Sequence, residues 1–236
     1  MREAELTYYF QHLEEFPVPQ AFSGHTYAYE ALLGLKAVMA VLLPKGCGQE
    51  ILGEVMENAT ILEDVHIGKG TVVHPGVVIE GPVWIGENCE LMAGAYLRPN
   101  TLVGNRCVVG HCCELKHSIL QNGAKVQSFT FAGDSLIGKS ARVGSGAILA
   151  NRKFNQTNAL LKIDGELLDL GTDFFGCVLG DNSRVGANSV TLPGAHIGPY
   201  TWIMPGTRVK GFVAERLRVS ARQELEITPN GALDLK

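Results

Sequence analysis

Aliphatic residues recur at every sixth position through much of the chain, without a slip from residue 55 to residue 115. A period of six matches neither the 3.6 residues per turn of an α-helix nor the two-residue alternation of a half-buried strand. Four positions after each aliphatic residue stands a small or β-branched one, such as Ala59, Cys89 or, at the end of the run, Ile119. The aliphatic positions are Val55, Ile61, Ile67, Val73, Ile79, Ile85, Leu91, Leu97, Val103, Val109 and Leu115. A fixed short period indicates a repeat architecture with the hexad as its unit.

The six-residue frame continues beyond residue 115 with two shortened steps and one long interruption. Five-residue steps lead from Leu115 to Leu120 and from Ala132 to Ile137, and the frame stops at about 150–176. The other later positions are Val126, Val143, Leu149, Leu179, Val185, Thr191, Ile197, Ile203 and Val209. Inward residues of a regular repeat only pack, so we expect function to depend on the breaks at 118–135 and 150–177.

Each hexad fits one short strand followed by a tight corner. Glycines such as Gly68, Gly104 and Gly144 directly follow the aliphatic residue, where a corner needs unusual dihedrals or close backbone approach. Three hexads then close one triangular coil of about 18 residues, and stacked coils pair their strands in parallel. The sequence therefore predicts an all-β fold, a hexapeptide-repeat parallel β-helix.

The rest of the chain predicts three domains. Residues 1–50 form an N-terminal helical segment, 51–212 the β-helix, and 213–236 a C-terminal tail or cap. The first helix would bury one apolar face, and a second would run from Tyr27 to Leu43 and end at Pro44. The residues of that apolar face are Leu6, Tyr9, Phe10, Leu13 and Phe16. Within the insertion at about 150–176, we expect a β-hairpin that turns at Asp164 and Gly165.

Composition excludes several classes of protein. With 46% apolar and 19% charged residues the chain is not disordered, and a net charge of −4 argues against a general nucleic-acid binder. The N-terminus lacks the basic and apolar stretches of a signal peptide, so we expect a cytoplasmic protein. The stretch 27–43 contains Glu30 and Lys36 and is too short for a membrane span, which needs about 20 residues.

The six cysteines predict neither a disulfide framework nor a metal site. No two of them form a CxxC pair, and adjacent Cys112 and Cys113 cannot both face inward. A metal site would need converging histidine, cysteine or carboxylate ligands. We expect reduced, mostly interior thiols and no metal.

The segment EGPVWIGENCELMAGAYLRPNTLVGNRCVVGHCCELKHSILQNGAKVQSFTFAGDSLIGKSARVGSGAILAN, residues 80–151, carries a family resemblance. It resembles the acetyltransferase domain of the bifunctional N-acetylglucosamine-1-phosphate uridyltransferases, and more closely the C-terminal half of archaeal-type sugar-1-phosphate nucleotidylyltransferases. The likeness covers roughly residues 50–212. It implies a left-handed coil, and we expect the nucleotidyltransferase domain to be absent.

The resemblance implies transfer of acetyl from acetyl-CoA to the amine of an amino-sugar 1-phosphate, at a cleft between the subunits of a homotrimer. Arg98, which precedes Pro99 and Asn100, and Lys116 in Glu-Leu-Lys match positions that hold the sugar phosphate. Asn151 matches an asparagine that binds the sugar. The pantetheine arm of CoA would run along Ser145, Ala187 and Pro205.

The sequence departs from the family at the catalytic position. The family's general base is a histidine in a motif like K-V-P-H-L-S-Y-V-G-D, and here Ser128 replaces that histidine and Phe131 the tyrosine. A serine hydroxyl has no pKa near neutrality, whereas a positioned base contributes about 10²- to 10⁴-fold. Arg142 replaces a family asparagine and adds positive charge.

Two histidines are alternative bases, namely His117 beside Lys116 and His111 one hexad earlier. The remaining histidines are interpreted as surface or edge residues: His12, His25, His66, His74 and His196. Arg98 and Lys116 could instead be solvated charges. A catalytically silent sugar-phosphate or CoA-binding scaffold, partnering a separate nucleotidyltransferase, is the alternative function. A zinc hydratase on this fold would need three interfacial histidines, which the sequence does not show.

A cationic run lies near the C-terminus. It contains Arg208, Lys210, Arg216, Arg218 and Arg222 against Glu215. Such a run would suit the phosphates of CoA if its members gathered on one surface. A solvated tail is the equally simple interpretation.

Overall fold

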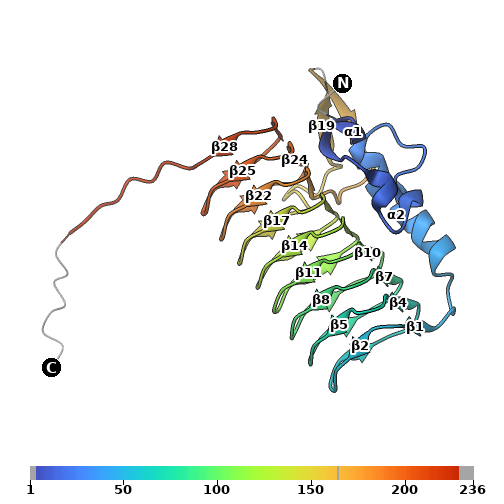
Figure 1. The fold of residues 1–236 in the computed structure, drawn as a ribbon. Helices are drawn as coiled ribbons and strands as arrows, with labels where there is room; N and C mark the ends of the chain where they lie inside the picture. Colours follow the sequence, from blue (N-terminus) through green and yellow to red (C-terminus); the bar gives the residue numbers. More distant parts are fainter. Residues whose placement is uncertain (1–3, 164, 229–236) are drawn as a thin grey trace, which may run out of the picture.

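The computed structural model describes residues 4–163 and 165–228, and its main body is a triangular β-solenoid of about nine coils (Figure 1). The described strands stack into three parallel sheets, named here by the order in which the chain visits them. The first face contains β1 (Gln49–Ile51), β4 (Val65–Ile67), β7 (Val83–Ile85), β10 (Thr101–Val103), β13 (Ile119–Leu120), β16 (Leu136–Ile137), β21 (Cys177–Leu179), β24 (Ala195–Ile197) and β27 (Phe212–Val213).

The second face contains β2 (Glu54–Val55), β5 (Val72–Val73), β8 (Glu90–Leu91), β11 (Val108–Val109), β14 (Lys125–Val126), β17 (Arg142–Val143), β22 (Arg184–Val185), β25 (Trp202–Ile203) and β28 (Arg218–Val219). The third face contains β3 (Thr60–Ile61), β6 (Val78–Ile79), β9 (Tyr96–Leu97), β12 (Glu114–Lys116), β15 (Phe131–Gly133), β18 (Ile148–Leu149), β23 (Val190–Thr191) and β26 (Arg208–Val209). The last strand, β28, lies within the segment that the sequence assigns to the tail.

The hexad residues fill the inside of the triangle, which confirms the predicted parallel β-helix. Ile67, Ile85 and Leu115 are fully buried in one continuous core that also holds the small residues Ala95 and Cys107. Burying such an aliphatic side chain contributes about 1.5 to 3 kcal/mol, so the column of hexads is the main source of stability.

Ile119 corrects the sequence-based assignment at the first five-residue step. It faces outward on the first face and packs with the N-terminal segment instead of filling the small interior position. Ser118 takes that position: it is fully buried and its hydroxyl donates to the Ala132 carbonyl. The shortened step removes one residue from the corner, so the residue four positions after Leu115 points to the other side of the strand.

The N-terminal segment, residues 4–48, lies along the first face (Figure 1). It contains α1 (Leu6–Tyr9), η2 (Leu13–Glu15), η3 (Pro19–Ala21) and α2 (Ala28–Leu42). The predicted helix at 27–43 is confirmed. Glu30 accepts hydrogen bonds from the backbone N–H groups of Thr26 and Tyr27 at its start.

The prediction of a first helix that extends to Phe16 is wrong, because the chain leaves the helical conformation at Phe10 and His12 has a left-handed φ of 56°. Phe10 and Phe16 are nevertheless buried, together with Leu102, Ile119 and Leu136 of the first face. His196 belongs to the same outward row. It is 1% exposed between Tyr9 and Phe175, so the interpretation of it as a surface residue is wrong.

The insertion contains the expected hairpin. Strands β19 (Leu160–Ile163) and β20 (Glu166–Asp169) pair antiparallel, and the expected turn residue Asp164 lies outside the described residues. The chain rejoins the solenoid at β21. No helix in the described part of the chain is long and apolar enough to cross a membrane.

Candidate functional site

A cluster of polar side chains lies where the third face ends and the chain turns toward the first face. Lys116 is the last residue of β12 and His117 follows it, Asp134 follows β15, and Asn151 lies just beyond β18. Consecutive coils stack these positions above one another, so residues separated by 17 or 18 positions come into contact. We call Lys116, His117, Asp134 and Asn151 the Asp134 cluster.

Asp134 is the centre of this cluster. Its Oδ1 lies 3.0 Å from His117 Nδ1, and its Oδ2 accepts from Lys116 Nζ at 3.3 Å and from Asn151 Nδ2 at 2.5 Å. Burial acts to raise the pKa of this carboxyl, but the hydrogen bonds of His117 and Asn151 and the charge of Lys116 lower the pKa below its ordinary value. Asp134 is therefore ionised near neutral pH.

The ionised carboxylate fixes the tautomer of His117. A carboxylate can only accept, so the proton of the neutral imidazole lies on Nδ1 and its Nε2 carries the free lone pair. The His117 side chain is 24% exposed. An imidazole oriented in this way is able to take a proton from an acceptor group.

The insertion covers the cluster from outside. The Phe174 ring lies 4.0 Å from Lys116 Nζ and 4.8 Å from the Arg152 guanidinium, in cation–π geometry. Arg152 also pairs with Asp173 at 2.8 Å. The second break of the repeat therefore lies over polar residues at the two ends of the first break.

Gly133 lets Asn151, a member of the cluster, and Phe131 lie close to the backbone that precedes Asp134. A Cβ on this glycine would lie 2.5 Å from Asn151 Nδ2 and 2.7 Å from Phe131 Cζ. Any other side chain at this position would displace both. The site residues predicted from the sequence that lie close together are therefore Phe131, Lys116, His117 and Asn151. One coil below, Arg98 pairs with Glu114 at 2.8 Å.

The other sequence candidates lie elsewhere. Ser128 is in the corner between the second and third faces, at the opposite end of β15 from Asp134. Backbone hydrogen bonds stack that corner with the corners of Ser145, Ala187 and Pro205, and Ser128 also follows His111 in the same column. Arg142 lies on the second face. The structure thus separates an acidic–basic cluster from a column of small residues.

Asp134 is the residue that sequence reasoning missed. It follows a third-face strand within the predicted break, one 17-residue coil after His117, and that spacing was the available signal.

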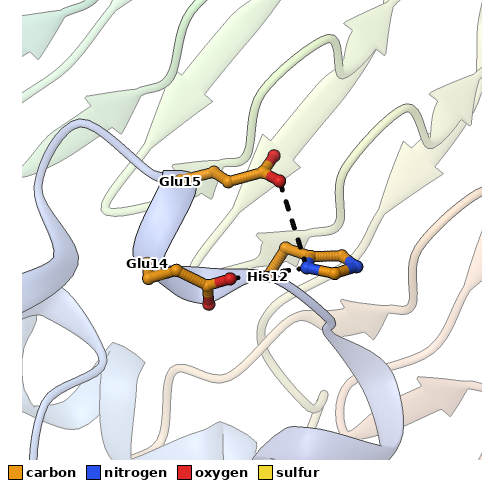
Figure 2. A group of neighbouring side chains, drawn as sticks. All are labelled: His12, Glu14 and Glu15. Carbon is orange, nitrogen blue, oxygen red and sulfur yellow. Dashed lines mark hydrogen bonds and ion pairs between the residues drawn. The ribbon is translucent and has the colours of Figure 1, made fainter.

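Among the described residues, one group could hold a metal ion by its spacing: His12, Glu14 and Glu15, whose ligand atoms lie within 4.8 Å of one another (Figure 2). All three side chains are exposed, and Glu15 is also paired with Lys139 at 2.5 Å. An exposed acidic group that is already neutralised gives no ground for a metal centre.

Comparison with known proteins shows what the chain is similar to. The model of the GMPPB C-terminal domain matches residues 79–204, more than half of the chain. The bifunctional sugar-1-phosphate nucleotidylyltransferase/acetyltransferase of Sulfurisphaera tokodaii is 34% identical over 158 residues, 67% of this chain and 39% of that protein. The chain thus spans less than half the length of that relative. The uncharacterized acetyltransferase YaiX of Escherichia coli O6:K15:H31 is 31% identical, over 69% of this chain and 70% of YaiX.

Among solved structures, the UDP-N-acetylglucosamine acyltransferase of Francisella novicida superposes with a TM-score of 0.52 at 14% identity. The superposition covers 74% of this chain and 66% of that one. This likeness shows the fold, a left-handed parallel β-helix, and so confirms the expected hand of the coil.

Proposed function

The chain belongs to the family of the GMPPB C-terminal domain, and from this premise we propose that it is an acyltransferase that takes an acetyl group from acetyl-CoA. The Asp134 cluster is the single observation that carries the proposal. A buried carboxylate that orients an imidazole, beside a lysine and an asparagine, is not required for packing a solenoid corner.

The acceptor we propose is an amino-sugar 1-phosphate, in keeping with the name of the Sulfurisphaera relative. Arg98 and Lys116 would contact its phosphate, and Phe131 and Asn151 its sugar ring. Both cations are already paired, with Glu114 and Asp134, so these four groups together carry no net charge.

The column of Ser128, Ser145, Ala187 and Pro205 would hold the pantetheine arm of CoA. Small side chains there leave the corner open to an extended ligand. His117 lies at the other end of the third face, so a single protomer offers the two halves of the reaction at separate places. A homotrimer would join them if the corner of one protomer faced the third face of the next.

The proton of the attacking ammonium would go to His117 Nε2. The free amine then forms a bond to the thioester carbon and the carbon–sulfur bond breaks. The nitrogen gives its second proton to the departing CoA thiolate, so that the products are the amide and the CoA thiol. Asp134 would stabilise the imidazolium that forms. Ser128 cannot take this proton, but its hydroxyl could donate a hydrogen bond to the thioester carbonyl.

The alternative is a silent binding scaffold, which the loss of the family's histidine and tyrosine at Ser128 and Phe131 favours. The double substitution Ser128→His and Phe131→Tyr separates the two. A scaffold that kept its sugar pocket would gain activity from this change.

The test is thiol release from acetyl-CoA in the presence of glucosamine 1-phosphate. We expect turnover in a preparation whose mass is three times 25.4 kDa, and a loss of at least about 100-fold in His117→Ala. The matched control is His66→Ala, since His66 is half-buried and stacks on Trp84 of the first face. Absence of thiol release from the parent with every amino-sugar phosphate tried contradicts the proposal, and activity that only the double variant shows identifies the scaffold.

A further inference from the structure

A row of cations runs up the second face. Strand register places Lys125, Arg142 and Arg184 directly above one another, followed by Trp202 and then Arg218. Neighbouring strands lie about 4.8 Å apart, so each of these side chains adjoins the next. We call these five residues the cationic row.

The charges of this row are not compensated. Elsewhere on the solenoid Arg98, Lys116 and Arg152 each pair with a carboxylate. Within the described ranges, by contrast, no carboxylate lies within 4.0 Å of any of the four cations of the row, which are Lys125, Arg142, Arg184 and Arg218. Like charges facing each other on adjacent strands destabilise a sheet, so this arrangement calls for an anion that the chain itself does not supply.

The geometry of the row suits a diphosphate. Arg184 is held in place, because its Nη1 donates to the carbonyls of Ser140 at 2.7 Å and Ser183 at 3.1 Å. Arg142 lies on the strand below, so two guanidinium groups at one strand spacing can each reach a phosphate of the same ligand.

The indole of Trp202 adds a stacking surface. It is 53% exposed and lies between Arg184 and Arg218. An exposed tryptophan flanked by arginines is the combination on which nucleobases stack.

Two glycines lie between the row and the Ser145 corner. Gly144 and Gly186 directly follow β17 and β22, and a Cβ there would lie 2.7 Å and 2.4 Å from backbone nitrogens of the next coil. These glycines therefore let successive coils stack closely beside Arg142 and Arg184.

We propose that the cationic row binds a nucleoside diphosphate group, with the diphosphate on Arg142 and Arg184 and the base on Trp202. The proposal rests on the proposed function, because both CoA and a nucleotide-linked sugar carry a base joined to a diphosphate. It also assigns Arg142 to the phosphates of that ligand and not to the Asp134 cluster.

The test is titration with ADP, followed by the fluorescence of Trp202 in a Trp84→Phe background. The chain has two tryptophans, and Trp84 lies on the first face against His66, so the remaining signal reports on the row. We expect ADP to quench this signal, adenosine to bind far more weakly, and the affinity for ADP to fall with added salt.

The double variant Arg142→Ala and Arg184→Ala should lose about 10- to 100-fold in affinity for ADP, since hydrogen bonds to charged groups contribute about 1.5 to 3 kcal/mol. Arg106→Ala, an exposed arginine at the corner between the first and second faces, is the matched control and should bind ADP as the parent does. Trp202→Ala, followed by calorimetry, should also weaken ADP binding.

Two further titrations identify the source of the diphosphate. Tighter binding of CoA than of ADP assigns the row to the acyl donor, and tighter binding of UDP-N-acetylglucosamine assigns it to a nucleotide-linked sugar. Either result supports the proposal. Binding that the double variant does not weaken, or no binding of any of the three ligands, overturns it.

A change of oligomeric mass in Arg184→Glu without a change in ADP affinity also overturns it, because the row would then face a second copy of the chain. These measurements need no acyl transfer. ADP binding without thiol release would contradict the proposed function and support the proposed role of the cationic row. Thiol release without ADP binding at the row would support the proposed function and contradict the role of the row.

Discussion

Asp134 organises three polar side chains around one buried carboxylate: Lys116 and His117 from the coil before it and Asn151 from the coil after it. Each partner donates to it, so the carboxylate is stabilised in its charged form despite its burial. Its pKa is lowered, which means that Asp134 stabilises the fold above the pKa of an unfolded aspartate and that this contribution is lost as the pH falls.

Asp134→Asn keeps the volume of the side chain and removes its charge. We expect kcat for thiol release to fall at least about 100-fold, because the imidazolium of His117 loses its counter-charge. The parent should lose stability as Asp134 is protonated at low pH, and Asp134→Asn should lack this part of the loss. Thermal unfolding of both proteins between pH 3 and pH 7 measures the difference.

Asp173→Asn is the control for Asp134→Asn, since Asp173 pairs with Arg152 outside the cluster. Rescue of the activity by Asp134→Glu would agree with positioning by a carboxylate. Equal kcat values in Asp134→Asn and the parent would contradict it.

His196 is a buried imidazole that is stable in its neutral form, whereas Asp134 is stabilised in its charged form. Its Nδ1 lies 3.0 Å from the carbonyl of Gly194, and its Nε2 has no hydrogen-bond partner in the part of the chain that the structure describes. Burial lowers the pKa of His196 to about 4. As the pH falls below about 6.5, the unfolded chain therefore binds a proton at this residue, whereas the folded chain binds it only near pH 4.

His196→Leu should make the protein less sensitive to mild acid. Between pH 7 and pH 4 the parent loses up to about 3 kcal/mol through this residue, at about 1.4 kcal/mol for each unit of pKa difference. Leucine suits the site because Leu102 and Leu136 occupy the same outward row. Urea unfolding at several pH values measures the difference, and parallel curves for the two proteins would contradict it.

At the scale of elements, the two outward rows next to each other have different roles. The first-face row is apolar and covered by the N-terminal segment, with Ile119 and Leu136 fully buried. The second-face row is open and becomes cationic from Lys125 upward. Short strands of the same kind therefore form a docking surface on the first face and a charged surface on the second face.

Ile119→Asp should destabilise the protein by about 3 to 5 kcal/mol, because it places an unpaired charge beneath the N-terminal segment. Val108→Asp is the matched control: Val108 is also an outward strand residue, but it is half-buried on the second face and adjoins Lys125. We expect a change below about 1 kcal/mol there. Chemical denaturation compares the two, and similar losses would contradict the difference in burial.

The insertion connects the two breaks of the repeat. Phe174 covers Lys116, and the adjacent Phe175 stacks on His196 at a centroid distance of 5.7 Å. One dipeptide thus reaches both the Asp134 cluster and the first-face core.

At the scale of the whole molecule, the repeat made the solenoid predictable because its period is set by packing inside each coil. Ile119 was misplaced because one missing residue reverses the side on which a side chain lies. Asp134 was missed because its partners become neighbours only through the 17-residue length of that coil.

Charge was harder to place than packing. The run from Arg208 to Arg222 is continuous in sequence, yet it divides: Arg208 lies on the third face, Arg216 stacks on Tyr200, and Arg218 lies on the second face. The cationic row is assembled instead from residues in five different coils. Sequence proximity therefore did not indicate which cations share one surface.

The N-terminal segment touches coils that are far apart along the solenoid. The Tyr8 hydroxyl accepts from the Glu215 N–H, the Gln11 N–H donates to Asp181, and the carbonyl of Glu15 accepts from Asn122. In a stack whose coils contact only their neighbours, the ends can fray independently. Here the loss of an end coil also breaks contacts with the N-terminal segment, so we expect the molecule to unfold as one cooperative unit.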